Sequence, residues 1–246
     1  MGKSILITGA SSGIGQALAL EMAGRGYHLG LAARNLAALR TAEQSIAKRF
    51  PQTQVVVTEW DVTDFSGAPS LIRQTADALG GLDIFFANAG IGLGEKIGRG
   101  EFEKARQTIM VNLLGAMATV DAAVARFLEQ GHGHVVGTCS VAAFRGMPRG
   151  SSYSASKAGF AVYLEALRAE TYGSGIDVTV LYPGYIDTPL NQMLKSRPFI
   201  IPVEKGASII AELIEKKKKR STVPVFPWNI IGPLLKILPT RVIARR

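Results

Sequence analysis

The chain opens with Ser4-Ile5-Leu6-Ile7-Thr8-Gly9-Ala10-Ser11-Ser12-Gly13-Ile14-Gly15, and this stretch decides its fold. The run before Gly9 is mostly apolar, as in a strand that is covered on both faces of its sheet. The glycines allow a tight turn, and the helix that follows offers the free N–H groups of its first turn to a phosphate. The alternative is a glycine-rich turn that binds nothing. We expect a nucleotide-binding loop that consists of Gly9, Ser11, Ser12, Gly13, Ile14 and Gly15.

Beyond this stretch, short apolar runs alternate with amphipathic stretches, which is typical of repeated strand–helix–strand units. The expected strands are residues 4–8, 28–33, 54–59, 82–87, 134–139, 177–181 and 223–226. The expected helices begin near Gly13, Asn35, Phe65, Phe102, Tyr153 and Val203. The chain has 246 residues, 47% of them hydrophobic, and shows no internal repeat. A single α/β domain with a substantial core is therefore the simplest interpretation.

Two segments interrupt this alternation. Residues 186–202 contain three prolines and are long for a connection, which predicts a lid or binding loop. The second segment is an apolar tail that follows the last expected strand, where Pro233 and Pro239 limit any helix to a short piece. We expect a catalytic domain over residues 1–226 and a tail over residues 227–246. The lid is expected to form an apolar pocket wall with Leu190, Met193, Leu194, Phe199 and Ile200.

The positive charge is concentrated at one end of the chain. The formal net charge is +9, and the segment from Lys216 to Arg246 holds nine basic residues and no acidic one. Residues 1–215 are therefore neutral, so the overall charge gives no reason to expect a nucleic-acid partner. A basic, apolar segment can lie in a membrane interface. The favoured alternative is that the tail packs over the substrate pocket or against a partner subunit.

The single cysteine, Cys139, excludes an intrachain disulfide and indicates a reducing compartment, so we expect a cytoplasmic protein, with membrane-peripheral placement as the alternative. We expect Cys139 itself to be a small core residue.

No apolar run approaches the ~18 residues that a membrane-spanning helix needs. His132 and His134 have no Cys, Asp or Glu partner close by in the sequence, so we expect no metal site.

Tyr153 and Lys157 are the residues that point most directly to a reaction. They are four positions apart, so a helix places them on one face, where the ammonium is expected to lower the pKa of the phenol from about 10. Such a phenol is a proton donor for a carbonyl. Ser140, at a strand end, can donate a hydrogen bond to the substrate oxygen. Asn112 lies among apolar residues, and its buried amide can hold a water that returns the proton to Tyr153. A Tyr-x-x-x-Lys pair alone also occurs on ordinary helix surfaces.

Arg34 stands where the second expected strand ends. A site for NAD usually has an acidic residue about 20 positions after the glycines, which binds the ribose 2′-hydroxyl. No acidic residue is present here, and a guanidinium suits a 2′-phosphate. We therefore favour NADP(H) over NAD(H), and the alternative is that Arg34 is an exposed residue at the start of a helix.

Other candidate cofactor residues follow later strands. Asp61-Val62 can contact the adenine, although Asp61 and Asp64 are also typical of turns and helix caps. Asn88-Ala89-Gly90 can cross-link strands and let the backbone pass close to the cofactor. Pro183-Gly184, Ile186 and Thr188 lie at the carboxyl edge of the expected sheet, where open α/β folds bind ligands.

Taken together, these residues resemble the short-chain dehydrogenase/reductase family over roughly residues 3–226. The resemblance rests on the order of Thr8-Gly9, Gly13, Gly15, Asp61, Asn88-Ala89-Gly90, Asn112, Ser140, Tyr153, Lys157, Pro183-Gly184 and Thr188. It implies a Rossmann-type doubly wound fold with a seven-stranded parallel sheet flanked by helices. It also implies a Ser-Tyr-Lys centre at Ser140, Tyr153 and Lys157, supported by Asn112, in a homodimer or homotetramer. The family's usual Asn-Asn-Ala-Gly is Ala87-Asn88-Ala89-Gly90 here.

We therefore expect an oxidoreductase that reduces a ketone or aldehyde to an alcohol, or catalyses the reverse, on an apolar small-molecule substrate. Tyr153 would supply the proton, and both Tyr153 and Lys157 would also contact the cofactor. Two alternatives stay open: a non-catalytic protein that binds NADPH, and a peripheral membrane reductase of a lipid-linked substrate.

Overall fold

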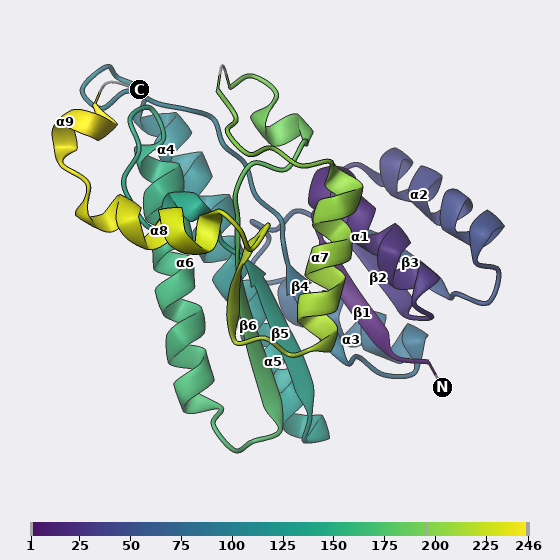
Figure 1. The fold of residues 1–246 in the computed structure, drawn as a ribbon. Coiled ribbons are helices and arrows are strands. Elements are labelled where there is room, and N and C mark those ends of the chain that lie inside the picture. The colour runs from purple at the N-terminus through teal and green to yellow at the C-terminus, as the bar shows by residue number, and fades with distance from the viewer. Residues whose placement is uncertain (1, 195, 245–246) are drawn as a thin grey trace.

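The computed structural model describes residues 2–194 and 196–244, so Met1, Lys195 of the predicted lid, and Arg245 and Arg246 of the predicted tail lie outside it. Its centre is a parallel sheet of seven strands in the order β3-β2-β1-β4-β5-β6-β7 (Figure 1). The strands are β1 Ser4–Thr8, β2 His28–Ala33, β3 Val55–Glu59, β4 Ile84–Ala87, β5 Gly133–Thr138, β6 Ile176–Pro183 and β7 Arg220–Val223. The predicted doubly wound sheet is confirmed.

Helices cover both faces of the sheet. The α-helices are α1 Gly13–Gly24, α2 Leu36–Arg49, α3 Ala68–Leu79, α4 Phe102–Ile109, α5 Ala116–Gln130, α6 Ser151–Glu170, α7 Val203–Glu215, α8 Trp228–Ile237 and α9 Thr240–Ile243. Short helical turns are η1 Met110–Gly115, η2 Val141–Ala143 and η3 Pro189–Asn191. A continuous helical run over Phe102–Gln130 is long and apolar enough to cross a membrane, but half of its most apolar window is buried in the domain.

The alternation of side chains along β1 explains the two layers. Ile5 and Ile7 point to one face and pack with helices α1, α2 and α7. Leu6 points to the other face and joins Phe85 of β4 and the helices α3, α5 and α6. Because both faces are covered, these strands are apolar almost throughout, as the sequence pattern predicts.

The two largest differences from the predicted element boundaries, at β7 and α3, have physical reasons. β7 begins and ends three residues earlier than expected, because Pro224 lacks the N–H that would continue the ladder beyond Val223. The helix expected near Phe65 begins at Ala68, because Asp64 accepts a hydrogen bond from the backbone N–H of Gly67 at 3.0 Å. Asp64 thus closes the turn before α3, whose N-cap is Gly67, and it is not the cap that the sequence offered as one interpretation.

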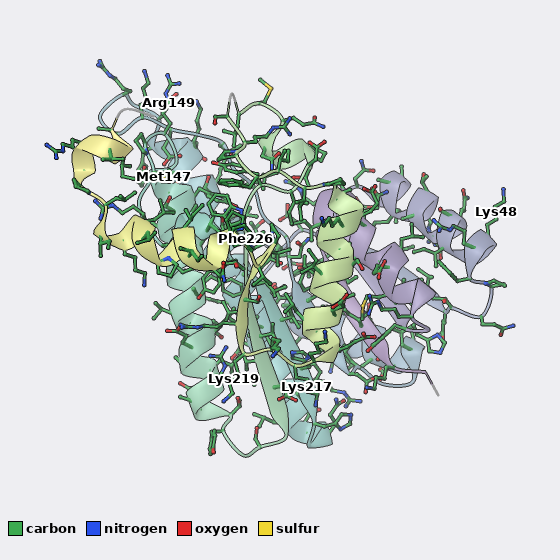
Figure 2. All side chains as sticks on the ribbon, viewed as in Figure 1. Lys48, Met147, Arg149, Lys217, Lys219 and Phe226 are labelled. Carbon is green, nitrogen blue, oxygen red and sulfur yellow. The ribbon has the colours of Figure 1, made fainter. Side chains whose placement is uncertain are left out.

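The tail and the lysine run lie at opposite ends of the sheet. Lys216 to Arg220 precede β7 at the amino edge, whereas α8 follows β7 at the carboxyl edge (Figure 1). Figure 2 shows Lys217 and Lys219 far from Met147 and Arg149, which belong to the loop before α6. The strand order changes direction between β1 and β4, and loops at the carboxyl ends of these strands form the site described next.

Candidate active site

Gly9 and Gly15 shape the loop between β1 and α1. Gly9 has a φ of +67°, and a Cβ there would lie 2.9 Å from the Cα of Ala89. A Cβ on Gly15 would collide with the carbonyl oxygen of Gly9. Only glycine therefore lets the loop, the start of α1 and the end of β4 pack this closely. The resulting cradle leaves the N-terminus of α1 open to a phosphate.

Asn88 fastens three neighbouring strands beneath this cradle. Its Nδ2 donates to the carbonyl oxygen of Thr8 at 3.1 Å, and its Oδ1 accepts from Thr138 Oγ1 at 3.4 Å. The backbone N–H groups of Asn88 and Ala89 in turn donate to Thr8 Oγ1. The predicted cross-linking amide is therefore present, and it joins the ends of β1, β4 and β5.

Arg34 and Asp61 mark the far end of the site. Arg34 Nη1 lies 3.8 Å from Asp61 Oδ2, and 69% of the Arg34 side chain is exposed. Asp61 also accepts hydrogen bonds from the N–H and hydroxyl of Thr63, both at 2.8 Å. Partial burial acts to raise the pKa of Asp61, but the bonds from Thr63 and the charge of Arg34 lower it overall. Asp61 is thus a turn residue, bonded through Oδ1. Its Oδ2 and the Arg34 guanidinium still face the site.

Ser140, Tyr153 and Lys157 converge at the other end, where β5 meets α6. The Ser140 hydroxyl accepts from the N–H of Ala142 at 3.1 Å and shares a hydrogen bond with the Tyr153 phenol. Lys157 Nζ is buried and donates to the carbonyl oxygen of Thr138 at 2.7 Å. The three side chains predicted as the reaction centre are therefore brought to one place by one strand end and one helix.

The pKa of the Tyr153 phenol differs from the sequence expectation. Burial raises this pKa above its ordinary value, and the hydrogen bond with Ser140 offsets only part of that effect. Lys157 Nζ donates to the carbonyl oxygen of Thr138 and not to the phenol, so no hydrogen bond from its ammonium offsets this burial. Burial lowers the pKa of Lys157 to about 8. At neutral pH the phenol is consequently protonated and ready to donate.

Asn112 lies behind the reaction centre, in the π-helical turn η1. Its Oδ1 accepts from the N–H of Ile91 and its Nδ2 donates to the carbonyl oxygen of Ile91, both at 2.8 Å. Nδ2 also lies 3.4 Å from Ser156 Oγ. A Cβ on Gly90 would be 3.3 Å from Asn112 Oδ1 and 3.4 Å from Lys157 Nζ, so the two side chains flank the same backbone. Asn112 therefore clamps the loop after β4 onto η1 and α6.

One cavity of about 1070 Å³ joins the two ends of the site. Small-molecule sites usually enclose about 300–1,000 Å³, so this cavity has room for a dinucleotide with a substrate beside it. Every predicted cofactor residue except Gly15 lines it, and so does every predicted catalytic residue except Asn112. Gly15 lies under the loop and Asn112 behind Gly90. The cradle and the continuous cavity fit a nicotinamide dinucleotide.

The lid forms the outer wall of this cavity, and contacts between its two ends hold it together. Ile186 and Ile201 form an isolated parallel bridge, and the Asp187 N–H donates to the carbonyl oxygen of Ile201 at 2.9 Å. Arg197 Nη1 binds Asp187 Oδ1 at 2.6 Å. Leu190, Met193, Leu194 and Pro198 of the loop line the cavity. Of the five predicted wall residues, Phe199 and Ile200 do not line it.

Glu95 is the residue of the site that the sequence analysis missed. It is 5% exposed, and its Oε1 accepts from the Ser151 hydroxyl and the Ser152 N–H, both at 2.6 Å. Burial acts to raise the pKa of Glu95, but these two bonds lower it overall. The carboxylate thus binds the first turn of α6 directly before Tyr153. A lone glutamate in a glycine-rich loop carries no sequence signal of this contact.

Trp228, the first residue of α8, packs the tail against the site. A Cβ on Gly184 would collide with Trp228 Nε1, so glycine is required for this contact. The Trp228 ring lies 5.9 Å from the ring of Tyr185 and 6.0 Å from that of Phe199. The tail therefore supports the Pro183-Gly184 turn from behind, but none of its described residues, 227–244, lines the cavity, so it does not pack over the pocket. The contact with a partner subunit stays a prediction.

Two candidate reactive groups are structural. Burial raises the pKa of the Cys139 thiol to about 12, and Cys139 is a core residue as predicted. Burial lowers the pKa of His134 to about 4, and its Nε2 lies 2.8 Å from Thr179 Oγ1. Within residues 2–194 and 196–244, no three His, Cys, Asp or Glu side chains gather as a metal site.

Comparison with known proteins agrees with this geometry. A model of the short chain dehydrogenase family matches residues 3–198. The chain belongs to the short-chain dehydrogenase family. An uncharacterized oxidoreductase of Mycobacterium tuberculosis is 36% identical over 244 residues, which cover 99% of this chain and 96% of that protein. This match includes the tail, which the family model leaves out.

Solved structures of the family share the fold. An alcohol dehydrogenase from Thermococcus sibiricus, complexed with 5-hydroxy-NADP, is 25% identical with a TM-score of 0.82 and covers 90% of this chain and 96% of its own. A family member from Burkholderia phymatum in complex with NAD is 22% identical with a TM-score of 0.86, covers 100% of this chain and 95% of its own, and shows the fold alone. This short-chain dehydrogenase is therefore an oxidoreductase for alcohol or carbonyl groups with a nicotinamide cofactor.

Proposed function

We propose that this short-chain dehydrogenase is an NADPH-dependent reductase that converts a ketone or aldehyde to an alcohol, with Tyr153 as proton donor. The observation that carries the proposal is the convergence of Ser140, Tyr153 and Lys157 at one end of a cavity whose other end holds the glycine cradle and Arg34. A protein that only bound the cofactor would have no need of Ser140, Tyr153 and Lys157 together.

The residues divide the reaction among them. The nicotinamide, when bound in its reduced form, supplies the hydride that attacks the carbonyl carbon. As the C=O π bond breaks, Tyr153 Oη gives its proton to the carbonyl oxygen, so that one C–H and one O–H bond form. Ser140 Oγ stabilises the charge that builds on that oxygen. Lys157 stabilises the phenolate that remains, and a water near Asn112 returns the proton.

Tyr153→Phe is the experiment that tests this role. The variant keeps the ring but loses the donor, so turnover of a ketone with NADPH should fall by a factor on the order of 10²–10⁴, while the Kd for NADPH stays near that of the wild type. Tyr172→Phe is the matched control, because Tyr172 is 90% exposed and lies beyond the end of α6. Turnover retained in Tyr153→Phe would exclude the assigned role. Tight NADPH binding without turnover on a broad substrate panel would favour a non-catalytic binder.

Arg34 supports the choice of NADPH. Its guanidinium is largely exposed at the site, and its contact with Asp61 is long at 3.8 Å, so it is available to a 2′-phosphate. Arg34→Ala should weaken NADPH binding by roughly tenfold or more and leave NADH binding unchanged, because a hydrogen bond to a charged group contributes about 1.5–3 kcal/mol. Isothermal titration with both cofactors measures this. Equal affinities of the wild type for NADPH and NADH would refute the preference.

The homodimer or homotetramer implied by the resemblance stays a prediction.

A further inference from the structure

We propose that the lid and the outer face of α8 form one docking surface for a bilayer that contains anionic lipid. The mouth of the cavity would then open at the membrane, and the substrate would be an apolar carbonyl compound dissolved in the bilayer. The part of this inference that concerns the substrate rests on the proposed reductase function. The part that concerns docking rests on the surface alone.

Exposed apolar side chains are concentrated on this part of the chain. Met193 is 93% exposed, Ile237 76% and Phe226 72%. More than half of the large hydrophobic side chains that remain exposed come from the lid, the segment after β7 and the tail: Leu190, Met193, Leu194, Phe199, Ile200, Val225, Phe226, Ile230, Leu234, Ile237 and Val242. Contiguous exposed apolar surface of this kind marks an interaction site.

Helix α8 is apolar on both of its faces. Trp228, Gly232 and Leu235 are buried against the domain, where a Cβ on Gly232 would meet the ring of Phe144 at 2.6 Å. The opposite face presents a second apolar row with the spacing i, i+4, i+7, made of Ile230, Leu234 and Ile237. A helix that is hydrophobic all round is normally covered all round, and the domain covers only the inner face.

The surface is continuous with the mouth of the cavity. Leu190, Met193 and Leu194 line the cavity and are themselves exposed. Phe199, in the last part of the lid, contacts Trp228 at the start of α8 with ring centres 6.0 Å apart. Figure 2 shows Phe226 in front of the ends of the central strands, between the lid and α8. A layer that covered the outer face of α8 would therefore also meet the entrance to the site.

Charge identifies a bilayer as the occupant rather than a second copy of the chain. Arg145 Nη1 binds the carbonyl oxygen of Lys236 at 3.1 Å, and Lys236 and Arg241 are exposed on the tail. No acidic residue occurs after Glu215, and the acid of the lid, Asp187, is paired with Arg197. Two copies joined through this face by a twofold axis would both bring these cations to the interface, and neither tail would bring an acid to pair with them. Anionic headgroups complement them.

The lysine run is not part of this surface, in contrast to the sequence hypothesis that joined it to the tail. It lies at the amino edge of the sheet, where Lys217 Nζ pairs with Asp177 at 2.7 Å and Lys216 with Glu212 at 3.2 Å. The structure thus moves the candidate lipid contact from the lysine run to α8 and the lid.

Vesicle flotation with the full chain tests the proposal. The protein is mixed with vesicles of phosphatidylcholine alone or with added phosphatidylglycerol, and the floated fraction is measured at low and high salt. We expect flotation with the anionic vesicles and less of it at high salt. A wild-type protein that does not float would overturn the proposal. Truncation after Phe226 would also remove Trp228, so substitutions on the outer face make the cleaner test.

The key variant is Ile230→Ser with Leu234→Ser and Ile237→Ser, and the control is Val162→Ser, which removes a 65% exposed residue from α6. Apparent vesicle affinity should fall at least tenfold in the triple variant and stay unchanged in the control. Equal flotation of the triple variant and the wild type would overturn the proposal, as would a dimer that dissociates only in the triple variant. If the triple variant melts early, Ile237→Ser alone replaces it.

Turnover of a water-soluble ketone separates the two proposals. It should be the same in the triple variant and the wild type, because the substituted residues do not line the cavity. A wild type that floats but shows no turnover would overturn the reductase function and leave the docking surface intact. A wild type that shows turnover but does not float would overturn the docking surface and leave the reductase function intact.

Discussion

The reaction centre and the surface around its entrance are built in opposite ways. At the centre, Lys157 and Ser140 donate to the carbonyl oxygens of Thr138 and Pro183, and Asn112 bonds both backbone groups of Ile91. On the surface around the entrance, Met193 and Ile237 are 93% and 76% exposed. The centre is fixed by bonds that few other residues could make, whereas the entrance is defined only by size and apolar character.

This difference separates what the molecule does from what it acts on. The chemistry depends on atoms that are held within a few tenths of an ångström, so it requires residues of a particular type at particular positions. Selection of an apolar substrate depends on volume and surface, which many combinations of Leu, Ile, Met and Phe provide. Predictions that perturb one region and measure the other test how separate the two are.

Trp228→Ala is expected to have the largest effect on stability, because Trp228 connects the two regions. It is 4% exposed and packs against Gly184, Tyr185 and Phe199. Removal of a buried tryptophan costs about 3–5 kcal/mol of unfolding free energy, and the value should lie near the lower end because the buried Nε1 has no partner among the described residues. Urea denaturation measures it.

Ile237→Ala is the matched control for this prediction, because it lies on the outer face of the same helix. Its unfolding free energy should stay within about 0.5 kcal/mol of the wild type. Equal losses for Trp228→Ala and Ile237→Ala would mean that α8 does not pack as described, and the contrast between its two faces would fail.

The same contrast explains which parts could be predicted from the sequence. The order of the strands was predicted correctly, although β7 lies three residues earlier than expected, and the spacing of the motifs predicted that Ser140, Tyr153 and Lys157 come together. Both are local signals, and the roles of the three side chains stay predictions. Glu95 was missed because its partners, Ser151 and Ser152, are more than fifty positions away and belong to no motif. The phenol pKa was predicted with the wrong direction, because the spacing of Tyr153 and Lys157 does not reveal the burial that raises it.

Lys157→Met sharpens the description of the centre through a dependence on pH. Burial lowers the pKa of Lys157 from 10.5 to about 8 in the folded protein. Between these values the unfolded chain binds more protons than the folded one, so the stability of the wild type rises with pH across this window. Relative to the Met variant, the wild type should gain up to about 3 kcal/mol from pH 8 to 10.5, and nothing below pH 8.

Unfolding free energies of both proteins at a series of pH values measure this gain. Groups other than Lys157 titrate in both proteins and cancel in the difference. Parallel profiles would show that the lysine is not buried as a free ammonium, and the centre would then be less constrained than its hydrogen bonds indicate. The Met variant should also be inactive, which would make Lys157 a residue that is kept for function at the expense of stability at neutral pH.

Glu95→Gln should have the smallest of these effects. It is also the strictest test of the contrast between the reaction centre and the surface around its entrance. Its carboxylate holds the first turn of α6, and a neutral amide makes hydrogen bonds about half as strong, so Tyr153 should be positioned less well. We expect kcat to fall about tenfold, equivalent to about 1.4 kcal/mol, with the KM for NADPH unchanged. Glu103→Gln is the control, because Glu103 is paired with Arg106 on α4 and makes no contact with the loop of Glu95 among the hydrogen bonds of the described residues. A lower melting temperature with normal kcat would make Glu95 a merely structural residue. The predicted split, kcat lowered and KM kept, would instead place it among the residues that position the centre, and show that the fixed region extends into a loop that lines the same cavity as the variable lid.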